Sequence, residues 1–200
     1  MGIFELRRLC KAEPKLSEIL AMKDLLRLRT SLSEEIETLL NEQIKVEAHS
    51  SATYLAMSSW CNRQGFDYSA DYFMKQSHEE REHMLKLFNF VGDLGGHAVS
   101  PEVVGIPQEF DSFRDVFEKA LQQEIFVTQQ FNRLADQCMK SRDYMTFQFL
   151  QWFLKEQVEE EYVARRALEL FDVIGEEGTG RWEIDKNVRK IKYDNDTAGE

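Results

Sequence analysis

Apolar side chains recur at steps of three and four residues through four long stretches of the chain. That spacing places them along one face of an α-helix, so the pattern predicts four amphipathic helices and an all-α fold. Each helix is far longer than the mean of about 11 to 12 residues in globular proteins, which favours a bundle or a coiled coil. The expected helices run from about Ser33 to Arg63, from Tyr68 to Leu94, from just after Ser112 to Lys140, and from Asp143 to Gly175.

The connections between these helices distinguish a bundle from a coiled coil. Two are tight, at Gly65 and before Asp143, so the helices that they join should be antiparallel neighbours. The middle connection, 96–110, contains two prolines and is long enough to run the length of a bundle. We therefore expect an antiparallel four-helix bundle with one long crossover between the second and third helices. A short final helix is expected from Arg181 to Ile191, before a polar tail at 193–200.

Four glutamates interrupt the apolar faces of these helices. Each helix carries one of them on the stripe that otherwise builds the core. The four are Glu47, Glu80, Glu124 and Glu160, and their stripe neighbours include Gln43, Tyr54, Gln76, His83, Thr128, Gln157 and either Trp152 or Phe153. In an antiparallel bundle these positions can meet at a common level.

Burial of four carboxylates requires a positive partner. One unpaired carboxylate in an apolar interior costs several kcal/mol, and mutual repulsion raises the cost when four lie together. A domain whose total stability is only about 5 to 15 kcal/mol does not easily absorb such a cost. No lysine or arginine falls on the stripes near these glutamates, whereas two divalent cations would neutralise all four. We therefore expect a di-metal centre.

The ligand types on these stripes favour iron or manganese. They offer oxygen and one imidazole, His83, but no cysteine, which disfavours a structural zinc site. Glu80 and His83 form the Glu-x-x-His pair of carboxylate-bridged di-iron bundles, in which both residues reach one metal while the glutamate bridges to a second. Tyr54 lies two turns from Glu47 on the same face, where it can donate a hydrogen bond or an electron.

Each feature has a simpler interpretation when it is taken alone. A single Glu-x-x-His pair is commonly a surface pair, a lone Tyr54 is commonly a core tyrosine, and the acidic run 159–161 is typical of a solvated face. The convergence of one inward carboxylate from each helix is what favours a metal centre. His49, His78 and His97 show no such convergence, and we expect them to be structural.

Charge and composition limit the classes of partner and the cellular compartments that we expect for the protein. The formal net charge of −11 argues against a general nucleic-acid-binding role, because phosphate binding needs clustered lysine and arginine. No apolar run reaches the length of about 20 residues that spans a membrane, and the N-terminus lacks the apolar core of a signal peptide. Cys10, Cys61 and Cys138 are an odd number and widely spaced, as free thiols in a reducing compartment are. These features predict a cytoplasmic protein without membrane or nucleic-acid partners.

Three segments carry a more specific signal. They are Leu40-Asn-Glu-Gln-Ile44 followed by Glu47 and Tyr54, then His78-Glu-Glu-Arg-Glu-His-Met84, and Phe147-Gln-Phe-Leu-Gln-Trp152 leading into Glu156-Gln-Val-Glu-Glu160. They resemble, in turn, the first, second and fourth helices of the bacterial-type non-haem ferritins of the ferritin-like di-iron superfamily. The resemblance covers roughly residues 33–192.

The resemblance implies a centre for two iron ions in each subunit. Glu47, Glu80 and His83 would bind the first ion, with Glu80 as the bridge to the second. Glu124 and Glu160 would bind the second ion. It also implies that the chain oxidises Fe(II) with dioxygen or hydrogen peroxide and deposits ferric oxide inside a cage of 24 identical subunits.

The family's additional positions can be matched in the same way. Gln157 would be a weak ligand or a hydrogen-bond partner of the second iron, and Tyr54 would be the tyrosine beside the centre. Glu79, Glu156 and Glu159 match the ligands of an additional iron site.

Two departures from related patterns qualify the resemblance. A haem-binding bacterioferritin would have methionine where Arg81 stands and histidine where Glu160 stands, so we expect no haem. Residues 1–31 have no counterpart in the family, and we treat them as an extension to the bundle domain at 32–192. The first 30 residues of the chain carry seven basic and four acidic side chains, and the pattern of Leu16–Leu28 suggests a short amphipathic helix. This segment could dock on the cage, bind a partner or lie upstream of the ancestral start.

Three other classes of protein would use similar helices. A di-iron oxygenase or peroxidase of the rubrerythrin type would need an apolar substrate pocket and usually has two Glu-x-x-His motifs, whereas this chain has one. A mini-ferritin that protects DNA would place its ligands between subunits. A structural coiled coil would need apolar residues in place of the four glutamates. Iron storage by a ferroxidase cage is therefore the favoured function.

Overall fold

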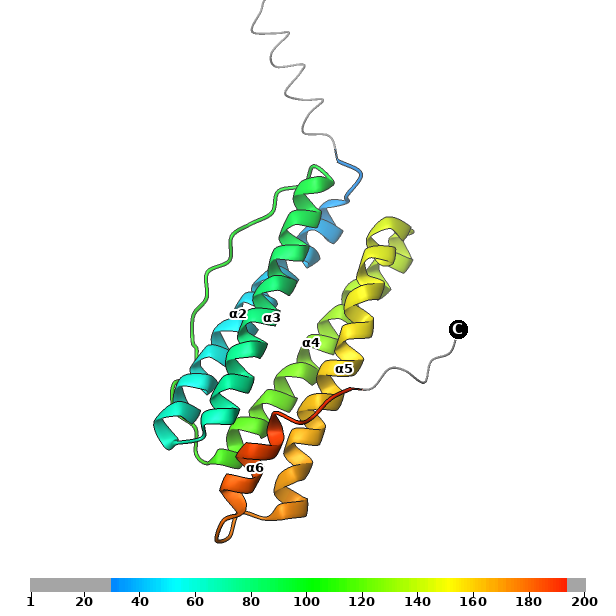
Figure 1. Ribbon diagram of the computed structural model, residues 1–200. Coiled ribbons are helices and arrows are strands. Elements are labelled where there is room, and N and C mark those ends of the chain that lie inside the picture. The colour runs from blue at the N-terminus through cyan, green and yellow to red at the C-terminus, as the bar shows by residue number, and fades with distance from the viewer. Residues whose placement is uncertain (1–29, 194–200) are drawn as a thin grey trace, which may run out of the picture.

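The computed structural model describes residues 30–193, which form five helices and no strand. The long helices are α2 (Glu34–Gln64), α3 (Asp67–Asp93), α4 (Phe113–Ser141) and α5 (Tyr144–Ile174), and the short one is α6 (Gly180–Val188) (Figure 1). They confirm the predicted four-helix bundle with a short C-terminal helix, although α6 ends three residues before the expected Ile191. Residues 1–29 of the N-terminal extension lie outside the described residues. They include Cys10 and the expected helix at Leu16–Leu28.

The bundle consists of two antiparallel hairpins, α2–α3 and α4–α5, joined by the predicted crossover (Figure 1). The crossover runs along the outside of the α2–α3 hairpin from one end of the bundle to the other, which makes α4 antiparallel to α2. Asn41 fixes this segment to α2, because its amide donates to the His97 carbonyl (3.0 Å) and accepts from the Val99 N–H (2.8 Å).

Side chains close the exposed N–H groups at the start of most of the long helices. Ser33, Ser112 and Asp143 each accept a hydrogen bond from the N–H three residues later, at 3.0 to 3.3 Å. At the other end of α2, Gly65 adopts φ = 81°, a left-handed conformation that glycine tolerates best.

The start of α3 receives its cap from a distant part of the chain. Phe66 stands at the N-cap position and offers no side-chain acceptor. Instead Asp185, buried on α6, accepts hydrogen bonds from the N–H groups of Ser69 (2.7 Å) and Tyr68 (3.4 Å). Its negative charge also lies at the positive end of the helix dipole. Helix α6 is therefore attached to α3 by a polar contact as well as by apolar packing.

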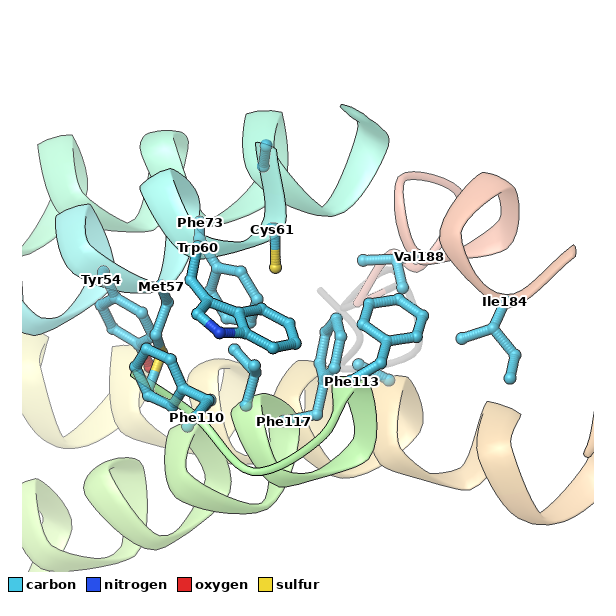
Figure 2. Packing of buried hydrophobic residues seen from close by; sticks show 14 of the residues in the cluster. Tyr54, Met57, Trp60, Cys61, Phe73, Phe110, Phe113, Phe117, Ile184 and Val188 are labelled. Atoms are coloured by element: carbon cyan, nitrogen blue, oxygen red, sulfur yellow. The ribbon is translucent and has the colours of Figure 1, made fainter. Parts of the chain in front are cut away.

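Two apolar clusters fill the bundle, and a polar layer separates them. The aromatic cluster lies toward the end that carries α6 and includes Tyr54, Trp60, Phe73, Phe113, Phe117 and Ile184 (Figure 2). The aliphatic cluster lies toward the other end and includes Ile36, Leu40, Ile44, Leu87, Leu134 and Leu150. On every long helix the glutamate of the core-facing stripe stands between residues of the two clusters. The four carboxylates therefore occupy one level of the bundle.

Within residues 30–193, no helix is long and apolar enough to cross a membrane.

Replacement of Asp185 by alanine should loosen the first turn of α3. Loss of a helix cap typically costs about 0.5 to 2 kcal/mol, and here it also leaves two N–H groups without their acceptor. We expect faster amide hydrogen exchange at Tyr68 and Ser69 and a lower melting temperature. Glu177→Ala, at an exposed position just before α6, is the control. Exchange at these two amides that is equal in both variants would show that Asp185 is not the cap.

Candidate metal centre

Helices α2 and α3 bring the first group of predicted ligands together. One ligand atom from each of Glu47, Glu80 and His83 lies within 4.8 Å of the others, and all three residues are buried. The His83 Nδ1 atom is 3.6 Å from Glu80 Oε2 and 3.9 Å from Glu47 Oε2. These separations exceed ordinary hydrogen-bond lengths. Both of those carboxylate oxygens also lack a hydrogen-bond partner although they are fully enclosed. Buried unpaired oxygens that converge with an imidazole are what a metal ion would complete.

Helices α4 and α5 supply the second group of predicted ligands. Buried Glu124 accepts a short hydrogen bond from the Tyr54 hydroxyl and another from Gln157 Nε2 at 3.3 Å. Glu160 lies at the edge of the layer, partly exposed, and accepts a hydrogen bond from Gln76 Nε2 at 2.7 Å. Both Gln157 and Tyr54 therefore contact Glu124. For Gln157 this is the group that the resemblance implied, whereas helical spacing had placed Tyr54 near Glu47.

The electrostatics of this layer oppose four ionised carboxylates. Burial is the main cause that raises the pKa of each of the four above its usual range, to about 7 for Glu124. Neighbouring carboxylates add to the rise, as Glu80 does for Glu47 and Glu124 does for Glu80. Among the described residues, the basic side chain that lies within 4.0 Å of the Glu47 and Glu80 carboxylates is His83. The layer therefore holds protons until cations replace them.

The three residues predicted for an additional site lie beside this layer, at the surface. Glu79, Glu156 and Glu159 line a cavity of about 790 Å³ that also reaches Glu160 and His83. The pKa of the Glu159 carboxyl is raised, first by partial burial and then by Glu156 and Glu79. The three carboxylates therefore lie near one another. This cavity connects the edge of the buried layer with solvent.

Three residues of the site have contacts that the sequence did not reveal. Gln43 and Gln76 were expected on the core-facing stripes, but not as hydrogen-bond donors to Glu47 (2.6 Å) and to Glu160. The contact of Gln43 could have been predicted from the sequence, because Gln43 precedes Glu47 by four residues, or one helical turn. Tyr72 lines the surface cavity, and burial together with Glu160, Glu124 and Glu79 raises the pKa of its hydroxyl.

Trp152 and Phe153 were alternatives for one position on the α5 stripe. Phe153 is the core residue, because only 1% of its surface is exposed against 38% for Trp152. Trp152 instead packs edge-on to His83, with 5.3 Å between ring centroids, at the cavity wall. His49, His78 and His97 are all exposed and stand apart from the cluster of ligands.

Comparisons with known proteins agree with this geometry. Residues 37–174 match the family model of the ferritin-like domain. A bacterial non-haem ferritin of Campylobacter jejuni is 38% identical over 160 residues, which cover 80% of this chain and 96% of that protein. A probable bacterial non-haem ferritin-like protein of Haemophilus influenzae is 37% identical over 160 residues, covering 80% and 97%.

Solved structures show the same similarity. An open pore ferritin from the archaeon Archaeoglobus fulgidus superposes with a TM-score of 0.77 at 34% identity, over 81% of this chain and all of that one. A ferritin from Chlorobium tepidum gives a TM-score of 0.71 at 39% identity, over 80% and 98%. With its bundle, its buried carboxylate layer and these relatives, the chain belongs to the ferritin family and is related to the bacterial non-haem ferritins.

Proposed function

We propose that the protein oxidises Fe(II) at a di-iron centre inside each subunit and stores the ferric product in a cage. The observation that carries the proposal is the buried carboxylate layer, in which the oxygens Glu47 Oε2 and Glu80 Oε2 have no partner beside His83. An oxygen-rich ligand set with one imidazole suits iron. The relatives of the chain are named as ferritins, which supports storage as the purpose of the chemistry.

Each of the two groups of ligands binds one of two substrate ions. Glu47, Glu80 and His83 bind the first Fe(II), and Glu124 and Glu160 bind the second, with Glu80 placed between them. Binding of both ions at one site makes the two-electron reduction of dioxygen or hydrogen peroxide effectively intramolecular. Carboxylate oxygens stabilise Fe(III) more than Fe(II), because the ferric ion has the higher charge.

Other residues deliver iron and support its oxidation. The cavity lined by Glu79, Glu156 and Glu159 leads from solvent to Glu160, and these three carboxylates can hold a further ion on that route. Gln157 orients Glu124 from one side. The Tyr54 hydroxyl donates a hydrogen bond to the same carboxylate, and the tyrosine can also supply an electron.

The proposal includes assembly and location. Stored ferric oxide needs an enclosed space, and the 24-subunit cage that the family resemblance implies would supply it. A reducing cytoplasm is where Fe(II) is available and where the cysteines stay reduced. The chief alternative, an oxygenase or peroxidase of the rubrerythrin type, needs an apolar substrate pocket beside the metals. The wall of the cavity next to this centre is instead rich in charged groups. It carries five glutamates and four lysine or arginine side chains beside its aromatic and aliphatic residues: Glu79, Glu82, Glu156, Glu159, Glu160, Lys75, Lys86, Arg189 and Lys192.

Anaerobic titration with Fe(II), followed by a pulse of oxygen, tests the centre directly. We expect fast oxidation of about two Fe(II) per chain, seen as ferric-oxo absorbance, in a particle of cage size. The double variant Glu80→Ala with His83→Ala should lose the fast phase and keep the particle. His78→Ala with Asp93→Ala, both exposed on α3, is the matched control. Oxidation that is unaffected by loss of Glu80 and His83 would contradict the site, and a monomer-sized particle would contradict the cage.

The stability of the metal-free protein should fall as the pH rises. Because Glu124 has a pKa of about 7 in the folded protein against an ordinary 4.5, the folded state binds this proton more tightly than the unfolded chain. The resulting stabilisation is fully present below about pH 4.5 and is lost as the pH passes about 7. At about 1.4 kcal/mol per pKa unit it amounts to about 3 kcal/mol at most.

Melting curves of the metal-free protein between about pH 5 and pH 8 measure this effect. Glu124→Gln should flatten the fall in melting temperature, whereas Glu118→Gln, in a surface ion pair on the same helix, should not. Addition of a redox-inert divalent cation at the upper pH should restore the melting temperature of the wild type. A fall of equal steepness in both variants would show that Glu124 is not a source of the pH dependence.

A further inference from the structure

Glutamine side-chain amides donate hydrogen bonds to three of the four carboxylates of the layer, and Glu80 is the exception. Gln43 Nε2 donates to Glu47 Oε1 at 2.6 Å, and Gln76 Nε2 donates to Glu160 Oε2 at 2.7 Å. Gln157 Nε2 lies 3.3 Å from Glu124 Oε2. Among the described hydrogen bonds, Glu80 receives none from an amide.

We infer that Gln43 and Gln76 are positioning residues that make Glu47 and Glu160 bind metal through one oxygen each. The inference rests on the proposed metal centre and goes beyond it, because neither glutamine is one of the proposed ligands. An oxygen that accepts a short amide hydrogen bond is turned away from the metal, so the carboxylate presents only its other oxygen. Carboxylates otherwise bind cations either through one oxygen or through both.

The contacts at Glu47 show this division most clearly. Its Oε1 atom accepts the Gln43 bond, and its Oε2 atom is fully buried, has no hydrogen-bond partner and lies 3.9 Å from His83 Nδ1. One oxygen is thus occupied and the other faces the remaining ligands. Gln43 is itself only 3% exposed, so water cannot easily replace it as the donor.

Gln76 distinguishes the bridging glutamate from the others. It stands one helical turn before Glu80 on α3, the same relation that Gln43 has to Glu47 on α2. Its amide nevertheless bonds across the bundle to Glu160 on α5. Glu80 is therefore left without an amide partner, and its buried Oε2 has no hydrogen bond. A residue that bridges two ions needs both of its oxygens, and no amide among the described hydrogen bonds occupies either oxygen of Glu80.

The amides also favour the charged form of the carboxylates that they bind. Burial raises the pKa of Glu47 and of Glu160, while the hydrogen bonds from Gln43 and Gln76 act in the opposite direction. Ions held through single oxygens have fewer bonds to break when ferric product leaves. The glutamines would therefore help both the capture of Fe(II) and the release of Fe(III).

Cobalt(II) is a suitable probe, because its d–d absorption is strong at low coordination number and weak when six ligands surround it. We would titrate the metal-free wild type and the Gln43→Met and Gln76→Met variants, in which the side chain keeps its length but loses its donor. Gln151→Met is the matched control, since the Gln151 amide bonds to the Phe147 carbonyl of its own helix.

We expect both variants to bind Co(II) about 10- to 100-fold more weakly, the usual effect of losing a group that orients a ligand. We also expect weaker d–d absorption per bound ion, because the freed oxygen adds a bond to the metal. Unchanged absorption per ion would overturn the inference whatever happens to affinity, because a merely structural glutamine would leave the coordination unaltered. An equal loss of affinity in Gln151→Met would overturn it too. Failure of the wild type to bind Co(II) would instead reject the metal centre itself.

Discussion

Mutual repulsion among four carboxylates in the middle of the bundle is the constraint on which the rest of the structure depends. Without cations these groups can stay buried only by holding protons, as their raised pKa values indicate. Apolar packing above and below the layer must therefore hold the helices together. The two clusters do this on either side, so the layer can remain electrostatically unfavourable when it is empty. A site that is costly when empty and neutral when filled has a strong affinity for divalent cations.

Hydrogen bonds and one open edge surround the layer. Glutamines occupy one oxygen each of Glu47 and Glu160, and the cavity at Glu160 keeps one edge of the layer open to solvent. The two oxygens of Glu124 accept from Tyr54 and Gln157. A fully enclosed site would bind ions permanently, which suits a structural metal. An enclosed centre with one acidic opening suits an ion that enters in one oxidation state and leaves in another.

Much of this arrangement was predictable, and the rest has a physical reason for being missed. Helical periodicity identifies the face of a residue, so the inward placement of Glu47, Glu80 and Glu124 followed from spacing alone. Periodicity does not identify partners on other helices, and for that reason the bond from Gln76 to Glu160 was not foreseen. The cap that Asp185 provides for α3 was missed for the same reason, since it joins residues far apart in the sequence. Neighbouring aromatic residues such as Trp152 and Phe153 differ by one helical step, which spacing cannot resolve when both are apolar.

The division of the bundle into two hairpins has a consequence for the order in which the centre forms. Glu47, Glu80 and His83 all belong to the α2–α3 hairpin, whose contacts close only a short loop and so cost little chain entropy. Glu124 and Glu160 belong to the other hairpin and join them only after the long crossover has been closed, which is the slow, entropically expensive event. Each half of the centre thus belongs to one local hairpin, and the two halves meet only when the chain has completed its tertiary fold. Binding of the second ion would act as a check on folding, because a chain whose hairpins have not docked has no place for it.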